Sequence, residues 1–228
     1  MYRRVMAVDV FLWGHHVGRI APDFGSYCQF QYDPAFVRTG IQIAPFQMPL
    51  REKIYKVVGF DLPKGAFWGL PGVFADSLPD AFGNALVDKW MEEQKIPKSM
   101  VSPLDRLAYV GARGMGALTY EPEIGPGRMQ PSAIDMRMLV EEARMALNAD
   151  LLKKGGDDAL REIIRVGTSA GGAQAKAVVA WNRATGEFLA GQENLPSGFE
   201  HWLIKFTPPG RSMSTVVRWT TIRRTSRF

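Results

Sequence analysis

Two features of this chain could bind phosphate groups. The first is a glycine-rich run of mostly small residues at 167–175, followed directly by Lys176. The second is Lys205, which lies in an apolar stretch at 202–206. Small residues let backbone N–H groups approach phosphate oxygens closely, and a lysine held on a strand supplies a fixed positive charge. Together they predict a nucleotide site.

Two other phosphate-binding patterns fit this stretch poorly. A Walker-type loop places a serine or threonine after its lysine and opens a helix, whereas Lys176 is followed by the strand-like run 177–181. A dinucleotide-binding fold needs its glycines at the end of a strand and an acidic residue about 20 positions later, and neither condition fits. Loop, hairpin and then strand lysine is the order found in protein kinases.

The sequence resembles the HipA-like serine/threonine kinase toxins of bacterial type II toxin–antitoxin modules. The matching segments are 69–80, 111–118, 168–176 and 202–206, and the resemblance covers about residues 5–206. It implies ATP-dependent phosphorylation of a protein serine, with ATP and Mg²⁺ as cofactors. It also implies a protein substrate and a HipB-like helix-turn-helix antitoxin as partner, which would make the DNA contact.

The resemblance assigns roles to individual residues. Lys205 would contact the α- and β-phosphates of ATP, and Ser169 matches the loop serine that these kinases autophosphorylate. A phosphate on Ser169 would repel the phosphates of ATP and switch the enzyme off. The alternative, on the chemistry of this serine alone, is that it only caps a turn. The remaining nucleotide-binding positions are Gly171, Gly172, Ala173, Gln174, Ala175 and Lys176.

The acidic residues that phosphoryl transfer requires have no counterpart after Lys205. Kinases use an Asp to orient the substrate hydroxyl, and an Asp and an Asn to hold Mg²⁺. This chain has no Asp after Asp158, and residues 207–228 contain no Asp, Glu, Asn or His. We therefore expect no catalytic residue here, a kinase-like fold truncated after its small lobe, and an inactive form that a frameshift would explain. Earlier in the chain, turn and helix-start roles are expected for Asp76, Asp80 and Asn84.

Two further hypotheses concern binding. In one, the chain is a non-catalytic module that contacts a HipB-like antitoxin or a kinase subunit. In the other, the C-terminal arginines bind DNA directly. The net charge is +5, from 28 basic and 23 acidic residues, and the five arginines of residues 207–228 account for the excess. The body is thus neutral, which argues against a broad nucleic-acid-binding surface.

Composition indicates a folded globular protein, with 46% hydrophobic and 22% charged residues. The fold class that we expect is α+β. A single cysteine, Cys28, and the absence of an apolar run of about 18 residues favour the cytoplasm, away from any membrane. No metal site is expected, because His15 and His16 lack cysteine or carboxylate ligands at suitable spacing. We predict a small mixed, β-rich N-terminal subdomain over 1–122, a linker over 123–132, a kinase-like small lobe of sheet and helix over 133–206, and a non-homologous, disordered tail over 207–228.

Periodicity predicts the individual elements. Residues 27–32 alternate with the period of a half-buried strand, and a turn at 14–18 is expected to separate the first two strands. Helices are predicted at 80–95, 104–110, 132–148 and 157–165. Further strands are predicted at 5–13, 117–120, 175–181, 187–190 and 202–206.

Overall fold

The computed structural model describes residues 4–25, 27–57, 67–114, 116–125, 176–190, 195–205 and 215–218. They form an α+β protein with two antiparallel sheets, which confirms the predicted class. The chain divides into two compact units. The first comprises Met1–Leu78 with Met91–Gly125, and the second comprises Pro79–Trp90 with Pro126–Phe228.

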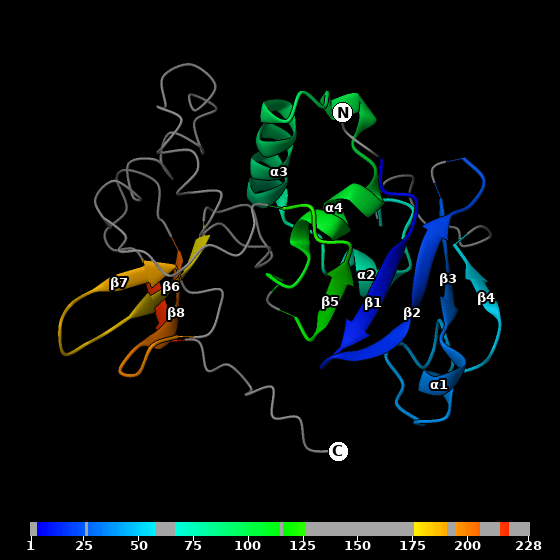
Figure 1. Ribbon diagram of the computed structural model, residues 1–228, viewed down its shortest axis with the longest axis horizontal. Coiled ribbons are helices and arrows are strands. Elements are labelled where there is room, and N and C mark those ends of the chain that lie inside the picture. The colour runs from blue at the N-terminus through cyan, green and yellow to red at the C-terminus, as the bar shows by residue number, and fades with distance from the viewer. Residues whose placement is uncertain are drawn as a thin grey trace. The chain divides into compact units, whose positions relative to one another are not determined.

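The first unit contains a five-stranded sheet in the order β4-β3-β2-β1-β5 (Figure 1). Antiparallel pairing of consecutive strands places the first four side by side, and β5 returns to pair with β1, as shown by the partners Val10 and Tyr120. The strands are β1 (Val8–Leu12), β2 (His15–Pro22), β3 (Cys28–Tyr32), β4 (Ile54–Lys56) and β5 (Leu118–Glu121). The helical elements are α1 (Pro34–Val37), α2 (Gly72–Ala75), η1 (Lys98–Met100) and α4 (Pro103–Val110), while α3 (Ala81–Glu93) spans the division between the units.

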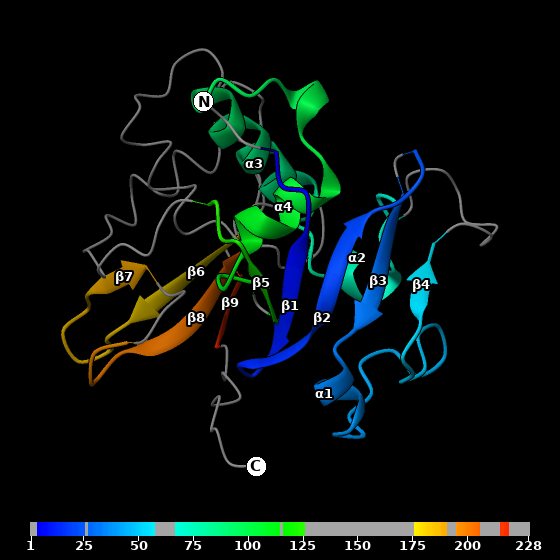
Figure 2. The same cartoon turned by 45° about the vertical axis from the view of Figure 1, so that its right-hand side comes forward.

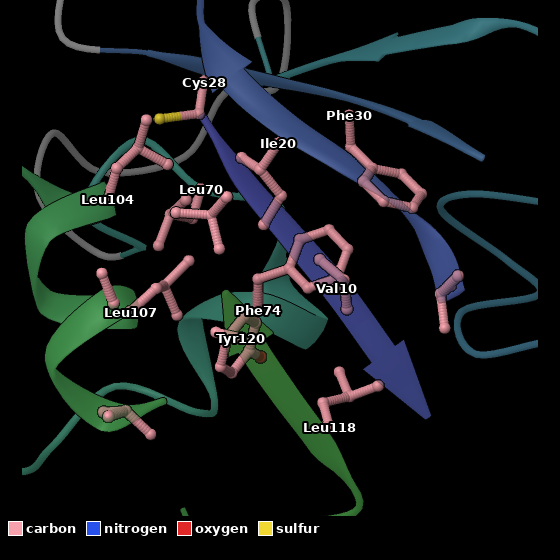
Figure 3. Close-up of a cluster of buried hydrophobic side chains, with 14 of the residues drawn as sticks. Val10, Ile20, Cys28, Phe30, Leu70, Phe74, Leu104, Leu107, Leu118 and Tyr120 are labelled. Atoms are coloured by element: carbon pink, nitrogen blue, oxygen red, sulfur yellow. The ribbon is translucent and has the colours of Figure 1, made fainter. Parts of the chain in front are cut away.

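The core of this unit lies on one face of the sheet, beneath α2 and α4 (Figure 2). Alternate residues of β1 and β3 are buried, as the period-two pattern of residues 27–32 predicts. Phe74 of α2 is fully buried and its ring centroid lies 4.8 Å from that of Phe30. Leu104 of α4 packs beside Cys28, which is buried at 4% exposure (Figure 3).

The start of α4 is fixed by hydrogen bonds that its sequence dictates. Ser102 caps the helix and accepts from the backbone N–H of Asp105, while the Asp105 carboxylate accepts from the N–H and hydroxyl of Ser102. Asp105 is fully buried and also accepts from the backbone N–H of Val5, at 3.1 Å. This carboxylate therefore ties the beginning of the chain to the helix.

The turn between β1 and β2 is shorter than predicted. It consists of Trp13 and Gly14, both with positive φ (52° and 86°), so that β2 resumes at His15 instead of after residue 18. Two-residue hairpin turns with positive φ at both positions match the twist of the flanking strands. A tryptophan in this conformation is uncommon, which is why the sequence pointed to the glycines at 14 and 18 instead.

The second unit contains a four-stranded sheet in the order β7-β6-β8-β9. Its strands are β6 (Lys176–Trp181), β7 (Phe188–Ala190), β8 (Glu200–Lys205) and β9 (Thr215–Arg218). The first three confirm the strands predicted from the sequence. β9 lies within the tail for which no regular structure was expected, and it forms a strand through its pairing with β8.

Several predictions fall on residues outside those described. They are the helices at 132–148 and 157–165 and most of the linker; the domain boundaries also stay predictions. In the described parts of the chain, no helix combines the length and apolar character that crossing a membrane would require.

Candidate functional site

The four-stranded sheet brings together two of the predicted nucleotide-binding positions. β6 begins at Lys176 and β8 ends at Lys205, and the antiparallel register makes these two residues direct partners. Lys205 is paired on its other side with Thr215 of β9. Since directly opposed residues of an antiparallel pair share one face of the sheet, the two lysine positions meet on the same face, at one end of the paired strands.

This register has an electrostatic consequence. Like charges at directly opposed positions destabilise an antiparallel pair, and Lys176 and Lys205 occupy such positions. Val178 and Val179 follow Lys176 and are at most 1% exposed, so the strand that carries the lysine is firmly packed. Lys176 therefore lies at the start of a strand whose middle is buried.

The rest of the predicted nucleotide site lies outside the described residues. This applies to Gly171, Gly172, Ala173, Gln174 and Ala175, and also to Ser169. Their roles stay predictions. The structure supports only the strand assignment of Lys176 and Lys205 and their pairing.

The opposite face of this sheet carries an aromatic cluster. The Trp181 ring stacks on Phe188 with 5.5 Å between centroids, and meets Trp202 edge-on at 5.2 Å. The Arg183 guanidinium lies 5.9 Å from the Trp181 ring centroid, at cation–π distance. Because strand residues alternate between faces, Trp181 and Lys176 occupy opposite faces of β6, and they also lie at opposite ends of this strand.

A polar cluster in the first unit was not predicted from the sequence. His16 of β2 contacts two carboxylates: its Nε2 lies 3.2 Å from Oδ1 of Asp9 and its Nδ1 lies 3.1 Å from Oδ2 of Asp33. Arg19 also donates two hydrogen bonds to Asp9, at 2.7 and 2.9 Å. We call these four residues the His16 cluster; it links β1, β2 and the start of α1.

Both carboxylates of the His16 cluster are stabilised in their ionised form. The hydrogen bond from Arg19 lowers the pKa of Asp9, helped by His16 and opposed by partial burial. The backbone N–H of Ala35, 2.7 Å from Oδ1 of Asp33, lowers the pKa of that carboxyl, again with help from His16. The register of β1 and β2, which shifts between Val10 and Phe11, brings Asp9, His16 and Arg19 together, and the pairing of β2 with β3 adds Asp33. No spacing in the sequence signals it.

Comparison with known proteins identifies the first unit. Residues 8–121 match the model of the HipA N-terminal domain family, half of the chain, from the first residue of β1 to the last of β5. The chain belongs to the HipA N-terminal domain family. No curated protein gives a significant match to the chain.

Within the HipA N-terminal domain, two segments that carried the resemblance have structural roles. In the segment 69–80, the carbonyl of Gly69 accepts a hydrogen bond from the N–H of Cys28 at 2.8 Å, and Phe74 enters the core. In the segment 111–118, Gly111 ends α4 with φ of 51°, and a Cβ at this residue would lie 2.6 Å from Glu123. Only glycine fits there.

The acidic residues before the glycine-rich loop serve at helix ends, as predicted. Oδ1 of Asp80 accepts from the N–H of Gly83 at 2.9 Å in the first turn of α3, and the Asn84 amide donates to the carbonyl of Pro79 at 2.7 Å. Asp76 is the C-cap of α2. Among the described residues, no group of three or more His, Cys, Asp or Glu side chains is arranged to hold a metal ion.

Proposed function

We propose that this chain is a HipA-family toxin of the protein serine/threonine kinase type, in a form that transfers no phosphoryl group by itself. The pairing of Lys176 with Lys205 carries the nucleotide part of the proposal. Two lysines on packed strands, beside the loop 171–175, would supply positive charge and backbone N–H groups to the phosphates of a Mg²⁺-bound ATP. Ser169 is then the autophosphorylation site of that loop.

The second part of the proposal concerns activity. Phosphoryl transfer needs an Asp that orients the substrate hydroxyl and side chains that hold Mg²⁺. Among the 228 residues, none of the required types follows Lys205. We therefore expect a polypeptide of these residues to bind ATP weakly and to leave the target serine of its protein substrate unmodified.

Incubation of the purified chain with γ-labelled ATP, with and without Mg²⁺, tests this proposal when followed by mass mapping. We expect no label on the chain and none on the Lys205→Ala variant. Label on Ser169 that depends on Mg²⁺ and is lost in Lys205→Ala would refute the inactive form.

Binding of a fluorescent ATP analogue tests the nucleotide site separately. The double variant Lys176→Ala/Lys205→Ala should abolish the weak binding, whereas Lys56→Ala removes a lysine of the other sheet and should leave it unchanged. If the original protein and both variants bound the analogue equally well, the lysine pair would not be part of the nucleotide site.

A second candidate function is a non-catalytic docking module. The HipA N-terminal domain has its own core, formed by the sheet with α2 and α4, and this supports a unit able to fold and bind without a kinase reaction. The partner would be a HipB-like antitoxin, through which DNA is contacted indirectly, or a kinase subunit. Calorimetric titration of the full chain with such an antitoxin tests this; the affinity should be the same for Lys205→Ala, and an affinity that falls with that variant would favour the nucleotide-dependent function.

A further inference from the structure

The connection between α1 and β4 presents a phenylalanine to solvent in an unusual setting. We call residues 38–53 the Phe46 loop. The Phe46 side chain is 99% exposed, while Met48, two residues later, is 3% exposed. The N–H of Met48 donates to the carbonyl of Ala44 at 2.8 Å and closes a turn around Phe46. Phe46 is therefore at the apex of a hydrogen-bonded turn.

The Phe46 loop is fixed to the domain next to this apex. The hydroxyl of Tyr32 donates to the carbonyl of Met48 at 2.9 Å, and the hydroxyl of Tyr55 donates to the carbonyl of Pro49. The side chain of Gln47 lies against Gly72 at the start of α2. Both tyrosines belong to the sheet and are buried. Core contacts on either side of the apex complete the attachment, and they involve Ile43, Ala44 and Leu50.

These attachments prevent Phe46 from folding inward. Burying a phenylalanine side chain is worth about 1.5–3 kcal/mol relative to leaving it in water, and here that stabilisation is not gained. Isolated exposed apolar residues are common and need no explanation by themselves. What distinguishes Phe46 is its fixed backbone, since a segment whose backbone is already ordered loses less conformational entropy on binding. Aromatic anchors of this kind dominate the free energy of many protein interfaces.

The charge balance of the Phe46 loop is positive. The Lys53 ammonium lies 4.8 Å from the Tyr55 ring centroid. Burial raises the pKa of the Tyr55 hydroxyl, and the positive charge of Arg51 is close enough to oppose that shift. Both basic residues are exposed, and Glu52 is the only acidic residue between Arg38 and Lys56. Because Lys56 is paired with Asp23 at 3.0 Å, the exposed charges that the Phe46 loop offers to a partner are Arg38, Arg51 and Lys53 against Glu52, a positive balance.

We propose that the Phe46 loop is a docking anchor, which inserts the Phe46 ring into an apolar pocket of a partner protein whose rim carries aspartate or glutamate. The ring supplies the apolar contact, and Arg51 and Lys53 pair with the acidic rim, where complementary charge favours encounter and orientation. The anchor depends on neither ATP nor the lysine pair of the second sheet. A failure of the nucleotide proposal would leave it unaffected.

Site-specific photo-crosslinking in cells tests the anchor with the full chain. The probe is p-benzoylphenylalanine, placed at position 46 or, as the matched control, at Phe24. Phe24 is also strongly exposed, at 88%, but lies in the turn between β2 and β3. We expect position 46 to crosslink to one partner, at a mapped site with neighbouring Asp or Glu residues, and at a yield about ten-fold above that of position 24, since binding energy concentrates at anchor residues.

Charge reversal gives the second arm of this experiment. The variant Arg51→Glu/Lys53→Glu, combined with the probe at 46, should lower the crosslinked yield about ten-fold, because repulsion from an acidic rim slows association. The proposal is overturned by any of four results: no crosslink, equal crosslinking from both positions, attachment to a second copy of this chain or to a site without acidic neighbours, or a yield that charge reversal leaves unchanged. Phe46→Ala should unfold at the same urea concentration as the original protein, which separates docking from stability.

Discussion

The two sheets of this molecule bury their strands differently. In β1 of the HipA N-terminal domain, every second residue is buried, with Val8, Val10 and Leu12 facing the core. In β6 of the second unit, the consecutive residues Val178, Val179 and Ala180 are all at most 1% exposed. The first sheet thus has one core face and one face available for polar groups such as the His16 cluster, whereas the middle of β6 is enclosed on both faces.

As a result, charged residues lie at different places in the two sheets. In the five-stranded sheet, charged side chains lie along the strands themselves, where His16 and Arg19 contact Asp9. In the four-stranded sheet, the paired lysines are at the strand ends, beyond the buried stretch of β6. Burying an unpaired charge is costly, so a strand whose middle is buried on both faces carries its charged residues at its ends.

The largest loss of stability is expected from a cavity in the core of the five-stranded sheet. Phe74→Ala removes a fully buried ring that contacts Phe30, and should cost about 3–5 kcal/mol in the free energy of unfolding. Val179→Ala in β6 removes much less volume and should cost about 2 kcal/mol. Urea denaturation, followed separately for the two units by amide hydrogen exchange, measures both. If Val179→Ala were the more damaging change, the second sheet would be the more tightly packed of the two.

The second-largest loss of stability is expected from removing the buried Asp105 carboxylate at the start of α4. Asp105→Ala removes the helix cap and leaves the N–H groups of Val5 and Ser102 without this acceptor, a loss of about 2–4 kcal/mol. The same denaturation experiment measures it. Ser102→Ala serves as a control that removes one hydroxyl only, and a loss as large as that of Asp105→Ala would show that the contact to Val5 adds nothing.

A smaller, pH-dependent effect is expected from the His16 cluster. The pKa values of Asp9 and Asp33 in the folded protein lie below the ordinary value of 3.8. Below pH 3.8 the unfolded chain therefore binds more protons than the folded one, and the stability that these carboxylates contribute at higher pH is lost as the pH falls. The Asp9→Asn/Asp33→Asn variant should lose less stability between pH 5 and about pH 2. Parallel acid-denaturation curves for the two proteins would argue against this role.

The smallest effect is expected from the edge of the aromatic cluster. Arg183→Ala removes a cation–π contact to Trp181 and should cost about 0.5–1 kcal/mol, as for other exposed contacts of this type. Tryptophan fluorescence during urea unfolding reports on it, with Arg183→Lys as the variant that keeps the charge. A result beyond 2 kcal/mol would mean that the arginine also holds the β6–β7 turn.

Much of the fold could be predicted because local residues decide it. The alternation from Cys28 to Tyr32 fixes β3, and Ser102 with Pro103 and Asp105 fixes the start of α4. What was missed depends on contacts between distant residues or on rare backbone conformations. Trp13 adopts a positive φ that its side chain disfavours, and the four-residue strand β9 is stabilised by its pairing with β8.

The candidate site was predicted to a similar degree. A lysine within an apolar run was enough to place Lys205 on a strand, and the hairpin between β6 and β7 followed from the turn residues 182–186. The direct pairing of Lys176 with Lys205 depends on the length of the connection between β6 and β8, which no local pattern specifies. The His16 cluster depends in the same way on the register of β1 and β2.

Cys28 can report on transient opening of the core of the first unit. It is the only cysteine of the chain, it lies in the core beneath Leu104, and burial raises its pKa to about 11. A thiol-reactive dye attacks the thiolate, so this residue should stay unlabelled for as long as the sheet and α4 remain together. The rate at which the native protein reacts with such a dye therefore measures how often the core opens. A second cysteine introduced on the surface could be labelled selectively in the unmutated background.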